Sequence, residues 1–407
     1  GYTLQGAENG TAIRVQRDRS NVTIENIKIK AFSIGIGISL DSSSNIIVNN
    51  YVISNGIGIT LRGFNHTIIN NKITSNLGYG IYLRGPCWSN TISNNDITWN
   101  KCNGIFSLGT TMDNVIANNM VSFNGEDESS GWQSGMSFKY GIDDSVISNN
   151  TIFSNHWYGI NGLSSNNIVT SNVIFSNPIG LMLFWDNNTI TNNLISNNEV
   201  GIEVRLESSG NIIHHNNFIN NIKQVRFEYI SLPNTWDDGY PSGGNYWSDY
   251  TGVDFYSGPY QNETCSDGIG DTPYVLDKNN QDNYPPMEAW SMFPVITATI
   301  DIVPNTLNLK SKGMWITSYI ELPKGYDVND INVFTILLND TVSAELRSTA
   351  IEDHDNDTIP DLMIKFNRDT IMLYLRANIN MTKLWEEKFM TLSLIITGFL
   401  NDGTLFQ

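Results

Sequence analysis

The segment DHDNDTIPD, residues 353–361, carries the clearest metal-binding pattern in the sequence. Positions 1, 3, 5 and 9 of a calcium-binding loop are filled by Asp353, Asp355, Asp357 and Asp361. Calcium prefers oxygen ligands, and such a loop gathers several of them around one ion. Position 12, which usually carries a bidentate glutamate, is Ile364. We therefore expect either a calcium site or an acidic hairpin that binds no metal.

A second group of acidic residues lies among glycine-rich turns further back in the chain. Carboxylates held close together by tight turns are suitable calcium ligands, although no complete calcium loop is present. Aspartate is also a common turn residue, because its side chain bonds to nearby backbone N–H groups. Both interpretations apply to Asp254, Asp267, Asp271 and Asp277.

A third group combines aromatic and basic side chains. Phrases of the type G-I-x-L recur, among them GIGITL at 56–61, GYGIYL at 78–83 and NGIFSL at 103–108. Alternate side chains of a strand share a face, so Tyr82 and Phe106 at the x positions point outward. Two residues further along their phrases, Arg62 and Arg84 add positive charge. We expect either a sugar-binding platform or long side chains that merely cover a flat sheet.

These residues sit within a repeat that fills the first half of the chain. Phrases such as TIINNKITSN, TISNNDITWN and VISNNTIFSN return every 21–31 residues, and a G-I-x-L phrase follows each of them. Each period therefore holds three short strands, too short for helices, and one copy cannot bury its own apolar face. The repeat predicts an all-β fold, a right-handed parallel β-helix of roughly nine or ten coils over residues 1–230.

The paired asparagines mark the bends between strands. Asparagine tolerates left-handed backbone geometry better than most residues, and stacked coils place amide over amide as a ladder. The second asparagine of each pair, or the residue aligned with it, falls at Asn26, Asn50, Asn71, Asn95, Asn119, Asn150, Asn172, Asn193 and Asn217. We expect these positions to be structural corners.

The repeats resemble the NosD-type, or CASH-type, carbohydrate-binding and sugar-hydrolase β-helix repeats, over about residues 1–230. The segment 231–284 contains GGNYWSDY and DGIGDTPY. It resembles the segment that closes NosD-like β-helices in archaeal secreted and cell-surface proteins. Such a cover is needed because the last coil exposes unpaired strand edges. Trp236 and Trp247 are expected to pack on that end.

The NosD resemblance raises copper as a cofactor, which would need clustered histidine, methionine or cysteine ligands. The only adjacent histidines are His214 and His215, and neighbours in a strand point to opposite faces. We therefore expect no copper. Catalysis on polysaccharides needs a carboxylate pair, or Arg or Lys beside calcium, on one outer face. No acidic pair recurs beside the aromatic positions, so no catalytic residue is predicted, and the sequence points away from an enzyme.

Beyond the β-helix the pattern changes. Residues 285–295, with PPMEAWSMFP at 285–294, are expected to be a linker. Residues 296–407 hold alternating strands of ordinary length, TIMLYLRA at 370–377 among them, which predicts an Ig-like β-sandwich. This part resembles a small β-domain appended to archaeal surface proteins, through IDIVPNTLNLKSKG at 300–313 and DHDNDTIPDLMIKF at 353–366.

Composition narrows the partners. The chain has 407 residues, a net charge of −18 and an isoelectric point near 4.5. An acidic chain has no basic surface with which to neutralise phosphates, so we expect no nucleic-acid partner. No apolar run approaches the roughly 20 residues of a membrane span. Cys87, Cys102 and Cys265 allow either one Cys87–Cys102 bridge or three free thiols.

Glycosylation sequons point to an extracellular or cell-surface location. They stand at Asn9, Asn21, Asn65, Asn149, Asn187, Asn262, Asn339, Asn356 and Asn380.

Two functions from different classes fit this sequence. The first is a non-enzymatic structural protein of the cell surface, a surface-layer, sheath or filament subunit or an adhesin. Its rod would assemble axially with further copies through bare strand edges. The second is a polysaccharide-binding or polysaccharide-processing β-helix of the lyase, epimerase or hydrolase kind, which would use the face around Tyr82 and Arg84 for cell-surface glycans.

Overall fold

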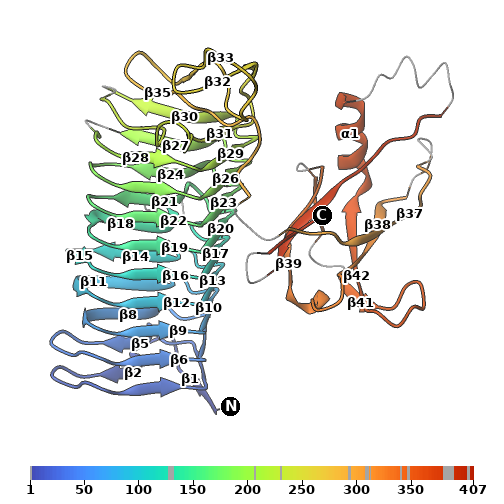
Figure 1. The fold of residues 1–407 in the computed structure, drawn as a ribbon. Coiled ribbons are helices and arrows are strands. Elements are labelled where there is room, and N and C mark those ends of the chain that lie inside the picture. The colour runs from blue at the N-terminus through green and yellow to red at the C-terminus, as the bar shows by residue number, and fades with distance from the viewer. Residues whose placement is uncertain are drawn as a thin grey trace. The chain divides into compact units, whose positions relative to one another are not determined.

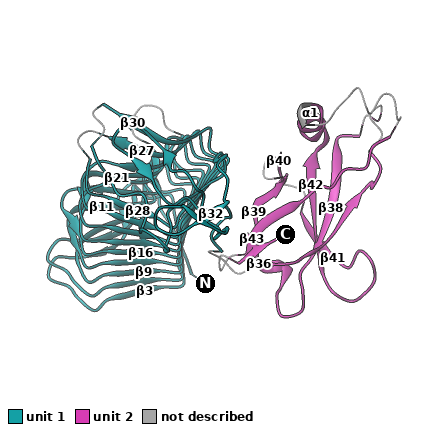
Figure 2. Cartoon of the chain, turned by 45° about the horizontal axis from the view of Figure 1, so that its top comes forward, with its two compact units in different colours: residues 1–292 teal, residues 293–407 magenta. Residues whose placement is uncertain are grey.

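The structure is a computed structural model of the chain. It describes residues 2–126, 133–205, 208–229, 232–291, 295–307, 311, 313–339, 342–345, 349–378, 389–400 and 404–407. The chain forms two compact units, residues 1–292 and residues 293–407, coloured separately in Figure 2.

The first unit is a right-handed parallel β-helix of about ten coils, as the repeat predicts. Each coil gives one strand to each of three sheets, and successive coils pair in parallel (Figure 1). The first sheet contains β1 (Tyr2–Gln5), β4 (Ile27–Lys30), β7 (Tyr51–Ile53), β10 (Lys72–Thr74), β13 (Asp96–Thr98), β17 (Met120–Ser122), β20 (Thr151–Phe153), β23 (Val173–Phe175), β26 (Leu194–Ser196), β29 (Asn217–Ile219) and β31 (Tyr246–Trp247).

The other two sheets complete each coil. The second sheet contains β2 (Thr11–Val15), β5 (Ile34–Ile38), β8 (Ile57–Phe64), β11 (Ile81–Trp88), β14 (Ile105–Leu108), β18 (Ser134–Ile142), β21 (Tyr158–Leu163), β24 (Ile179–Leu183), β27 (Val200–Arg205) and β30 (Lys223–Glu228), with β15 (Thr111–Met112) beside β11. The third contains β3 (Thr23–Glu25), β6 (Ile46–Val48), β9 (Thr67–Ile69), β12 (Thr91–Ser93), β16 (Val115–Ala117), β19 (Val146–Ser148), β22 (Ile168–Thr170), β25 (Thr189–Thr191) and β28 (Ile212–His214).

The register stacks like residues on like. Ile73 pairs with Ile97, which pairs with Val121 in the following coil, and all three side chains are fully buried. Because the side-chain period of a strand is two, a fixed register keeps every inward residue in the core. The core of the unit is therefore one continuous column of isoleucine, valine and leucine.

The two asparagines of a pair have different roles. Asn94 is exposed and has φ 53°, the left-handed bend that an L-residue with a short polar side chain can adopt. Asn95 is buried, and its Nδ2 donates to the carbonyls of Ile68 and Ser93 and to Oδ1 of Asn119 at 2.9–3.0 Å. The bend and the ladder are thus separate residues, and only the second asparagine carries the ladder.

Three such ladders run along the unit, one at each corner. The first has Asn50, Asn71, Asn95, Asn119, Asn150, Asn172, Asn193, Asn216 and Asn245; the second has Asn55, Asn76, Asn100, Asn124, Asn155, Asn177, Asn198 and Asn221; the third has Asn45, His66, Asn90, Asn114, Ser145, Asn167, Asn188, Asn211 and Asn234.

Two positions of the predicted alignment do not belong to the ladder. Asn26 takes the bend, with φ 56°, because its repeat has a single asparagine there. Asn217 opens strand β29, and the ladder member is Asn216, preceded by His215 at the bend with φ 55°.

Residues 231–284 close the β-helix as expected where they are described. Trp236 and Trp247 are almost fully buried at the end of the core, and Trp247 stacks on Phe218 and on Tyr274 with ring centroids 4.3 and 4.4 Å apart. The segment adds β32 (Tyr256–Ser257), β33 (Glu263–Thr264), β34 (Tyr274–Val275) and β35 (Gln281–Asp282). Trp290, from the expected linker, hydrogen-bonds with Asn217 and so lies on this unit.

The second unit is sandwich-like, with two small sheets and a separate core. One sheet contains β36 (Val295–Ile296), β44 (Leu405–Phe406), β43 (Ile396–Leu400), β39 (Ile331–Leu338) and β40 (Val342–Ser343). The other contains β37 (Thr299–Val303), β38 (Trp315–Glu321), β42 (Asp361–Asn367) and β41 (Ala350–Glu352). A short 3-10 helix, η1 (Val328–Asp330), precedes β39.

One predicted strand of this unit is a helix. The phrase TIMLYLRA lies in α1 (Arg368–Asn378). Its buried residues Ile371, Met372 and Leu375 follow helical spacing. Asn367 begins the helix, since its Oδ1 accepts the backbone N–H of Asp369 at 2.9 Å. The alternation of apolar and polar residues was too short to separate the two periods.

The described residues contain no disulfide and no membrane-spanning helix. No disulfide joins Cys87, Cys102 and Cys265 in the described part of the chain, so the Cys87–Cys102 bridge considered above is not formed. The Cys87 side chain points into the core, and burial raises the pKa of its thiol to about 12. None of the described helices is long and apolar enough to cross a bilayer.

Candidate binding sites on the two units

Three aromatic rings meet on the outer face of the second sheet. Tyr82 of β11 pairs with Phe106 of β14, and their ring centroids lie 5.6 Å apart. Tyr79, in the turn before β11, stacks on Phe106 at 4.4 Å and lies 5.0 Å from Tyr82. All three rings are half-buried. The prediction that Tyr82 and Phe106 point outward together is correct, and Tyr79 is an addition that the G-I-x-L pattern did not reveal.

Two arginines lie beside these rings. Arg62 Nε donates to the backbone carbonyl of Arg84 at 2.7 Å, which joins the ends of neighbouring coils. Within the described part of the chain neither guanidinium forms an ion pair with a carboxylate. Arg84 is exposed and Arg62 half-buried. Both positive charges are therefore available to an anionic ligand.

A second aromatic row lies past an irregularity in β11. The register shifts between Leu83 and Cys87, after which Trp88 pairs with Phe64. Trp88 and Phe64 are 43% and 42% exposed, whereas Cys87, which precedes Trp88, is fully buried. The sequence reading missed this row because the bulge falls after the G-I-x-L phrase. We call the set Phe64, Tyr79, Tyr82, Trp88 and Phe106, with Arg62 and Arg84, the aromatic face.

Further along the same sheet the outer face carries acidic and basic side chains that pair with one another. Glu203 pairs in register with Arg226, and its side chain is fully buried. Its carboxylate is bound by Arg205 on one side and by Arg226 Nε at 2.7 Å on the other. Arg205 also forms an ion pair with Glu228 at 2.5 Å. Burial raises the pKa of the neighbouring Tyr158. This network holds two cations and two anions, and it stabilises the sheet rather than offering a free acid.

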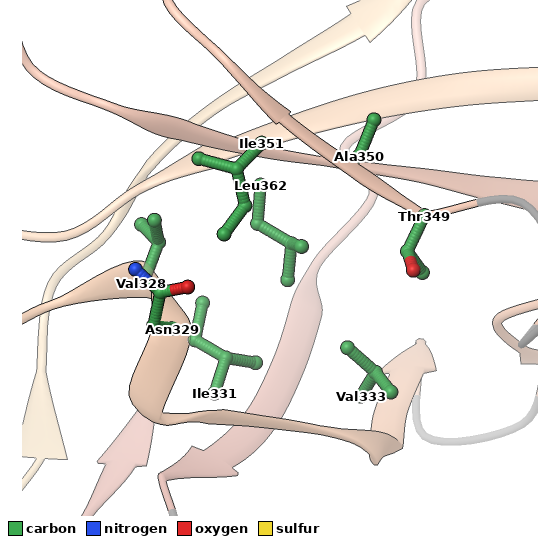
Figure 3. Close-up of a pocket in the computed structure, with 8 residues that line it drawn as sticks. All are labelled: Val328, Asn329, Ile331, Val333, Thr349, Ala350, Ile351 and Leu362. Atoms are coloured by element: carbon green, nitrogen blue, oxygen red, sulfur yellow. The ribbon is translucent and has the colours of Figure 1, made fainter.

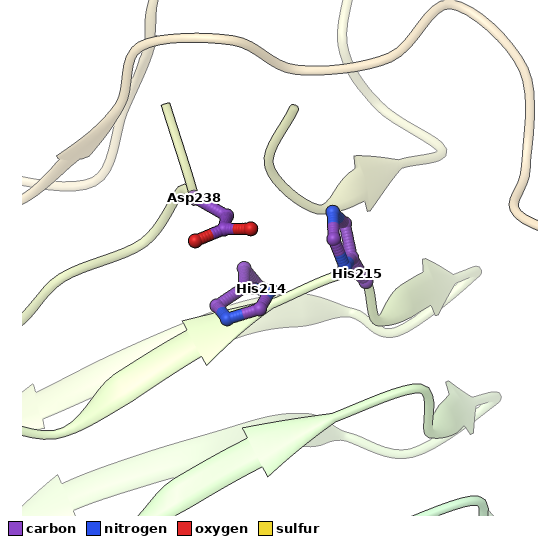
Figure 4. A group of neighbouring side chains, drawn as sticks. All are labelled: His214, His215 and Asp238. Atoms are coloured by element: carbon purple, nitrogen blue, oxygen red, sulfur yellow. The ribbon is translucent and has the colours of Figure 1, made fainter. Parts of the chain in front are cut away.

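His214, His215 and Asp238 gather at the closing end of the β-helix (Figure 4). One ring nitrogen of each imidazole and one carboxylate oxygen all lie within 4.8 Å of one another. The expectation that the two histidines face opposite ways is wrong, because β28 ends at His214 and His215 takes the left-handed bend at φ 55°. Asp238 comes from the turn that follows Trp236.

The electrostatics of this cluster favour neutral imidazole beside an ionised carboxylate. Burial, and then the neighbouring His215, lower the pKa of His214. A hydrogen bond from Ser242 Oγ, 2.7 Å from Asp238 Oδ2, lowers the pKa of Asp238, and the two histidines lower it further. Near neutral pH His214 is therefore uncharged and Asp238 carries its negative charge.

The acidic hairpin of the second unit gathers two overlapping sets of carboxylates. Ligand oxygens of Asp353, Asp355 and Asp361 lie within 4.8 Å of one another, and so do those of Glu321, Asp355 and Asp357. Glu321, on β38, was not foreseen because it is far from the loop in sequence. Burial raises the pKa of Glu321, and so do Asp357 and Asp355 beside it.

The hairpin backbone takes a loop-like form. Asn356 and Thr358 have φ 63° and 79°, so they occupy left-handed positions of the kind that favour glycine. Asp353 accepts the N–H groups of Asp357 and Thr358 at 3.0 and 3.1 Å. Calcium at this hairpin stays a prediction.

The weaker acidic group serves turns. Asp254 accepts the N–H groups of Asp267 and Gly268, and Asp271 accepts those of Phe255 and Tyr256, at 2.8–3.1 Å. Asp277 Oδ1 accepts the N–H of Asn279 at 2.8 Å. Calcium at these four residues also stays a prediction.

A shallow hollow of about 380 Å³ occurs in the second unit (Figure 3). It is lined by Val328, Asn329, Ile331, Val333, Thr349, Ala350, Ile351 and Leu362. None of these lining side chains is ionisable, so the hollow offers packing surface rather than chemistry.

The sequons are mostly where a glycan could be attached. Asn9, Asn21, Asn65, Asn149, Asn187, Asn262 and Asn356 are exposed and Asn339 is half-buried, while Asn380 lies outside the described residues. Four of them, Asn21, Asn65, Asn149 and Asn187, are left-handed bends of the coils. The sequons at Asn65, Asn149 and Asn187 arise from the repeat itself, in which a bend residue, a ladder residue and a threonine follow one another, whereas Val22 takes the middle position at Asn21.

The stacked coils and the three polar ladders define the class: this is a right-handed parallel β-helix repeat protein. Residues 5–121 match the family model described as right handed beta helix region, and residues 121–252 match the model described as periplasmic copper-binding protein (NosD). The chain thus carries a right-handed parallel β-helix, NosD-like over residues 121–252, with sandwich-like sheets at its C-terminal end. No curated protein sequence matches it.

Several solved structures are similar at low identity. The A-module of mannuronan C-5 epimerase AlgE4 from Azotobacter vinelandii is 15% identical, with 57% of this chain and 79% of that chain covered and a TM-score of 0.44. DFA-IIIase from Arthrobacter chlorophenolicus A6, without its lid, is 16% identical, with coverage of 60% and 71% and a TM-score of 0.45. An alginate lyase from Paenibacillus sp. is 15% identical, with coverage of 57% and 97% and a TM-score of 0.35.

Proposed function

We propose that the protein binds an acidic polysaccharide outside the cytoplasm, through the aromatic face. The observation that carries the proposal is the meeting of Tyr79, Tyr82 and Phe106 within 5.6 Å beside two arginines that have no carboxylate partner among the described residues. The negative face of an aromatic ring attracts the C–H groups of a sugar ring. A guanidinium binds a carboxylate in a bidentate manner, which a neutral sugar cannot match.

The fold supports binding to a chain rather than to a single sugar. Neighbouring coils are about 4.8 Å apart, so Tyr82 and Phe106 line up along the axis of the β-helix. The row of Phe64 and Trp88 lies on β8 and β11, so the two rows share the strand β11. A linear polymer lying across β8, β11 and β14 would contact both rows, with Arg62 and Arg84 between them. The ladders at the corners hold these strands in place before binding, which reduces the entropy lost on association.

Titration with polyuronates such as alginate and polygalacturonate tests this proposal. Calorimetry should show binding by the full chain, weaker binding of a neutral glucan, and loss of at least tenfold in affinity for a Tyr82→Ala/Arg84→Ala variant. The matched control is Tyr51→Ala/Lys28→Ala, which removes a tyrosine and a cation 4.8 Å from its ring on the first sheet. Equal binding by both double variants and the parent would sink the proposal.

Axial self-assembly into a surface layer, sheath or filament stays a prediction. It is compatible with polysaccharide binding, because the aromatic face lies on the side of the coils and not at their ends. Sedimentation and electron microscopy of the full chain test it. Particles that remain single at all concentrations, with and without calcium, would contradict it.

A further inference from the structure

We propose that His214, His215 and Asp238 form a binding site for one divalent transition-metal ion, with zinc and copper(II) as the best-suited ions. The proposal goes beyond polysaccharide binding, since these residues lie on the third sheet and the closing segment and not on the aromatic face. It rests on three observations: the meeting of three ligand atoms, the orientation of His215 and an unpaired nitrogen on His214.

The three ligands come from two different structural elements that are locked together. His214 is the last residue of β28 and His215 is the bend after it, and the backbone N–H of His215 donates to Gly244 O at 3.0 Å. The turn that carries Asp238 closes on itself, because Asp238 N donates to Gly243 O at 2.9 Å. A site whose ligands are fixed before the ion arrives loses little entropy on binding.

The second nitrogen of His215 is already committed. Its Nε2 lies 2.9 Å from the backbone oxygen of Ser242, which can only accept a hydrogen bond. Nε2 therefore carries the proton, and Nδ1 keeps a free lone pair. A metal-binding histidine usually donates its other ring N–H to a carbonyl or carboxylate in this manner. Trp290 packs edge-on against the same ring at 4.6 Å and restricts its rotation.

The imidazole of His214 has an unused polar atom. Its Nδ1 is buried and has no hydrogen-bond partner among the described residues. A buried polar atom without a partner is destabilising, and a bound ion removes that cost. Asp238 completes the set, since its Oδ2 accepts the Ser242 hydroxyl and its other oxygen remains available.

The chemistry of the ligands selects the ion. Two imidazole nitrogens and one carboxylate oxygen suit zinc and copper(II), whereas calcium prefers oxygen ligands alone. Copper(I) prefers sulfur, and the set contains neither cysteine nor methionine. Three protein ligands leave at least one coordination position of a tetrahedral ion for water or an external ligand. The site is therefore expected to hold an ion that a further molecule can approach.

Calorimetric titration of the chelator-treated full chain with zinc chloride tests this proposal. Every protein compared, the parent included, carries Asp355→Asn. This exchange disrupts both acidic sets of the second unit, because both contain Asp355. We expect one zinc ion per chain, and a loss of at least 100-fold in affinity for His214→Ala and for Asp238→Asn. Ser242→Ala should weaken binding by about 10-fold, since the serine only orients the ligands. His156→Ala, an exposed histidine beside Trp157, is the control and should bind as the parent does.

Copper(II) gives a second readout that does not depend on affinity. The electron paramagnetic resonance spectrum of the copper-loaded parent should show coupling to two imidazole nitrogens, and His215→Ala should reduce it to one. If His214→Ala does not fold, as judged by circular dichroism, Asp238→Asn decides the question because Asp238 is exposed. The proposal is overturned if the parent takes up no zinc, or if Asp238→Asn binds zinc as tightly as the parent.

Discussion

The β-helix and the C-terminal unit bury polar groups in different ways. In the β-helix every coil repeats the same three corners, and one buried asparagine satisfies the next, so that Asn95 receives hydrogen bonds from Asn71 and donates to Asn119. In the C-terminal unit the hydrogen bonds of buried polar residues follow no repeating pattern. Thr335 Oγ1, for example, accepts the N–H of Phe399 at 2.8 Å and donates to Asn332 O at 2.7 Å.

Because of this difference, the local sequence predicts a residue's structural role in the β-helix but not in the C-terminal unit. In the β-helix the position within the period fixes burial, bend and hydrogen bonding together, so one rule covers many residues. In the C-terminal unit the contacts of Phe366 or Phe406 depend on strands far away in the chain. Substitutions can therefore test whether the β-helix really depends on period position and the other unit does not.

The largest expected effect comes from the two residues of one asparagine pair. Asn119→Ala removes a ladder side chain and leaves Asn95 without its acceptor, so it should lower the free energy of unfolding of the β-helix by about 3–5 kcal/mol. Asn118→Ala, at the exposed bend with φ 57°, should cost only about 1–2 kcal/mol. Urea unfolding of the full chain measures both.

Asn118→Gly is the control for the bend, because glycine adopts left-handed geometry without strain. It should restore most of the stability that Asn118→Ala loses. Equal losses for Asn118→Ala and Asn119→Ala would break the separation of bend and ladder.

The next effect concerns pH and the end of the first ladder. Burial raises the pKa of Asp282 to about 7, even though its carboxylate accepts N–H groups from Asn245, Trp247 and Tyr284. The unfolded carboxyl has a pKa near 3.8, so the unfolded state loses this proton first. Protonated Asp282 therefore adds to the free energy of unfolding. This stabilisation is fully present below pH 3.8 and is lost as the pH rises through about 7, a change on the order of 2–4 kcal/mol.

Thermal melts of the β-helix between pH 4 and pH 8 measure this dependence. Asp282→Asn cannot titrate and should flatten this pH dependence, while Asp254→Asn, an exchange in the same closing segment, should leave it largely unchanged. A stability profile that is the same for the parent and Asp282→Asn would contradict the assignment.

A smaller effect is expected from the helix of the C-terminal unit. Asn367 Oδ1 accepts the N–H groups of Asp369 and Thr370 at 2.9 and 3.2 Å and so begins α1. Asn367→Ala should destabilise this unit by about 1 kcal/mol, and Asn367→Ser, which can still accept, by less. The β-helix transition in the same calorimetric scan should not move, and a shift in both transitions would show that the units unfold together.

The smallest effect belongs to the acidic hairpin. If calcium binds there, millimolar calcium should stabilise the C-terminal unit of the parent by about 1 kcal/mol through preferential binding to the folded state. Asp355→Asn should abolish that gain, and without calcium it should match or slightly exceed the parent, since one of several like charges is gone. No calcium-dependent shift in the parent would leave the hairpin as a plain turn.

Most of the architecture of the β-helix could be predicted from the sequence. The repeat occurs many times, so a misleading residue in one copy is recognised by comparison with the other copies. The prediction failed where a single coil departs from the residue types of the other coils. At His215 a histidine stands where other coils have asparagine or serine, so its bend was taken for strand and the histidine cluster was missed.

The remaining misses have similar physical causes. The bulge between Leu83 and Cys87 breaks the alternation that would have revealed Trp88, and Glu321 reaches the acidic hairpin only through the pairing of β38 with β42. Eight residues around Ile371 are too few to separate a helical period from a strand period, and the cap at Asn367 was the available signal.

The amide columns also make the rod polar from end to end. Each ladder amide donates toward the later coil and accepts from the earlier one, so every column is a one-way chain of dipoles. The three chains end on Asp282, Gln224 and Asn280, which accept from the last ladder residues, and Gln224 Nε2 in turn donates to Asp249 Oδ1 at 3.1 Å. The two faces at the ends of the stack are therefore chemically unlike, and a further coil could join the closing end only by replacing those three acceptors.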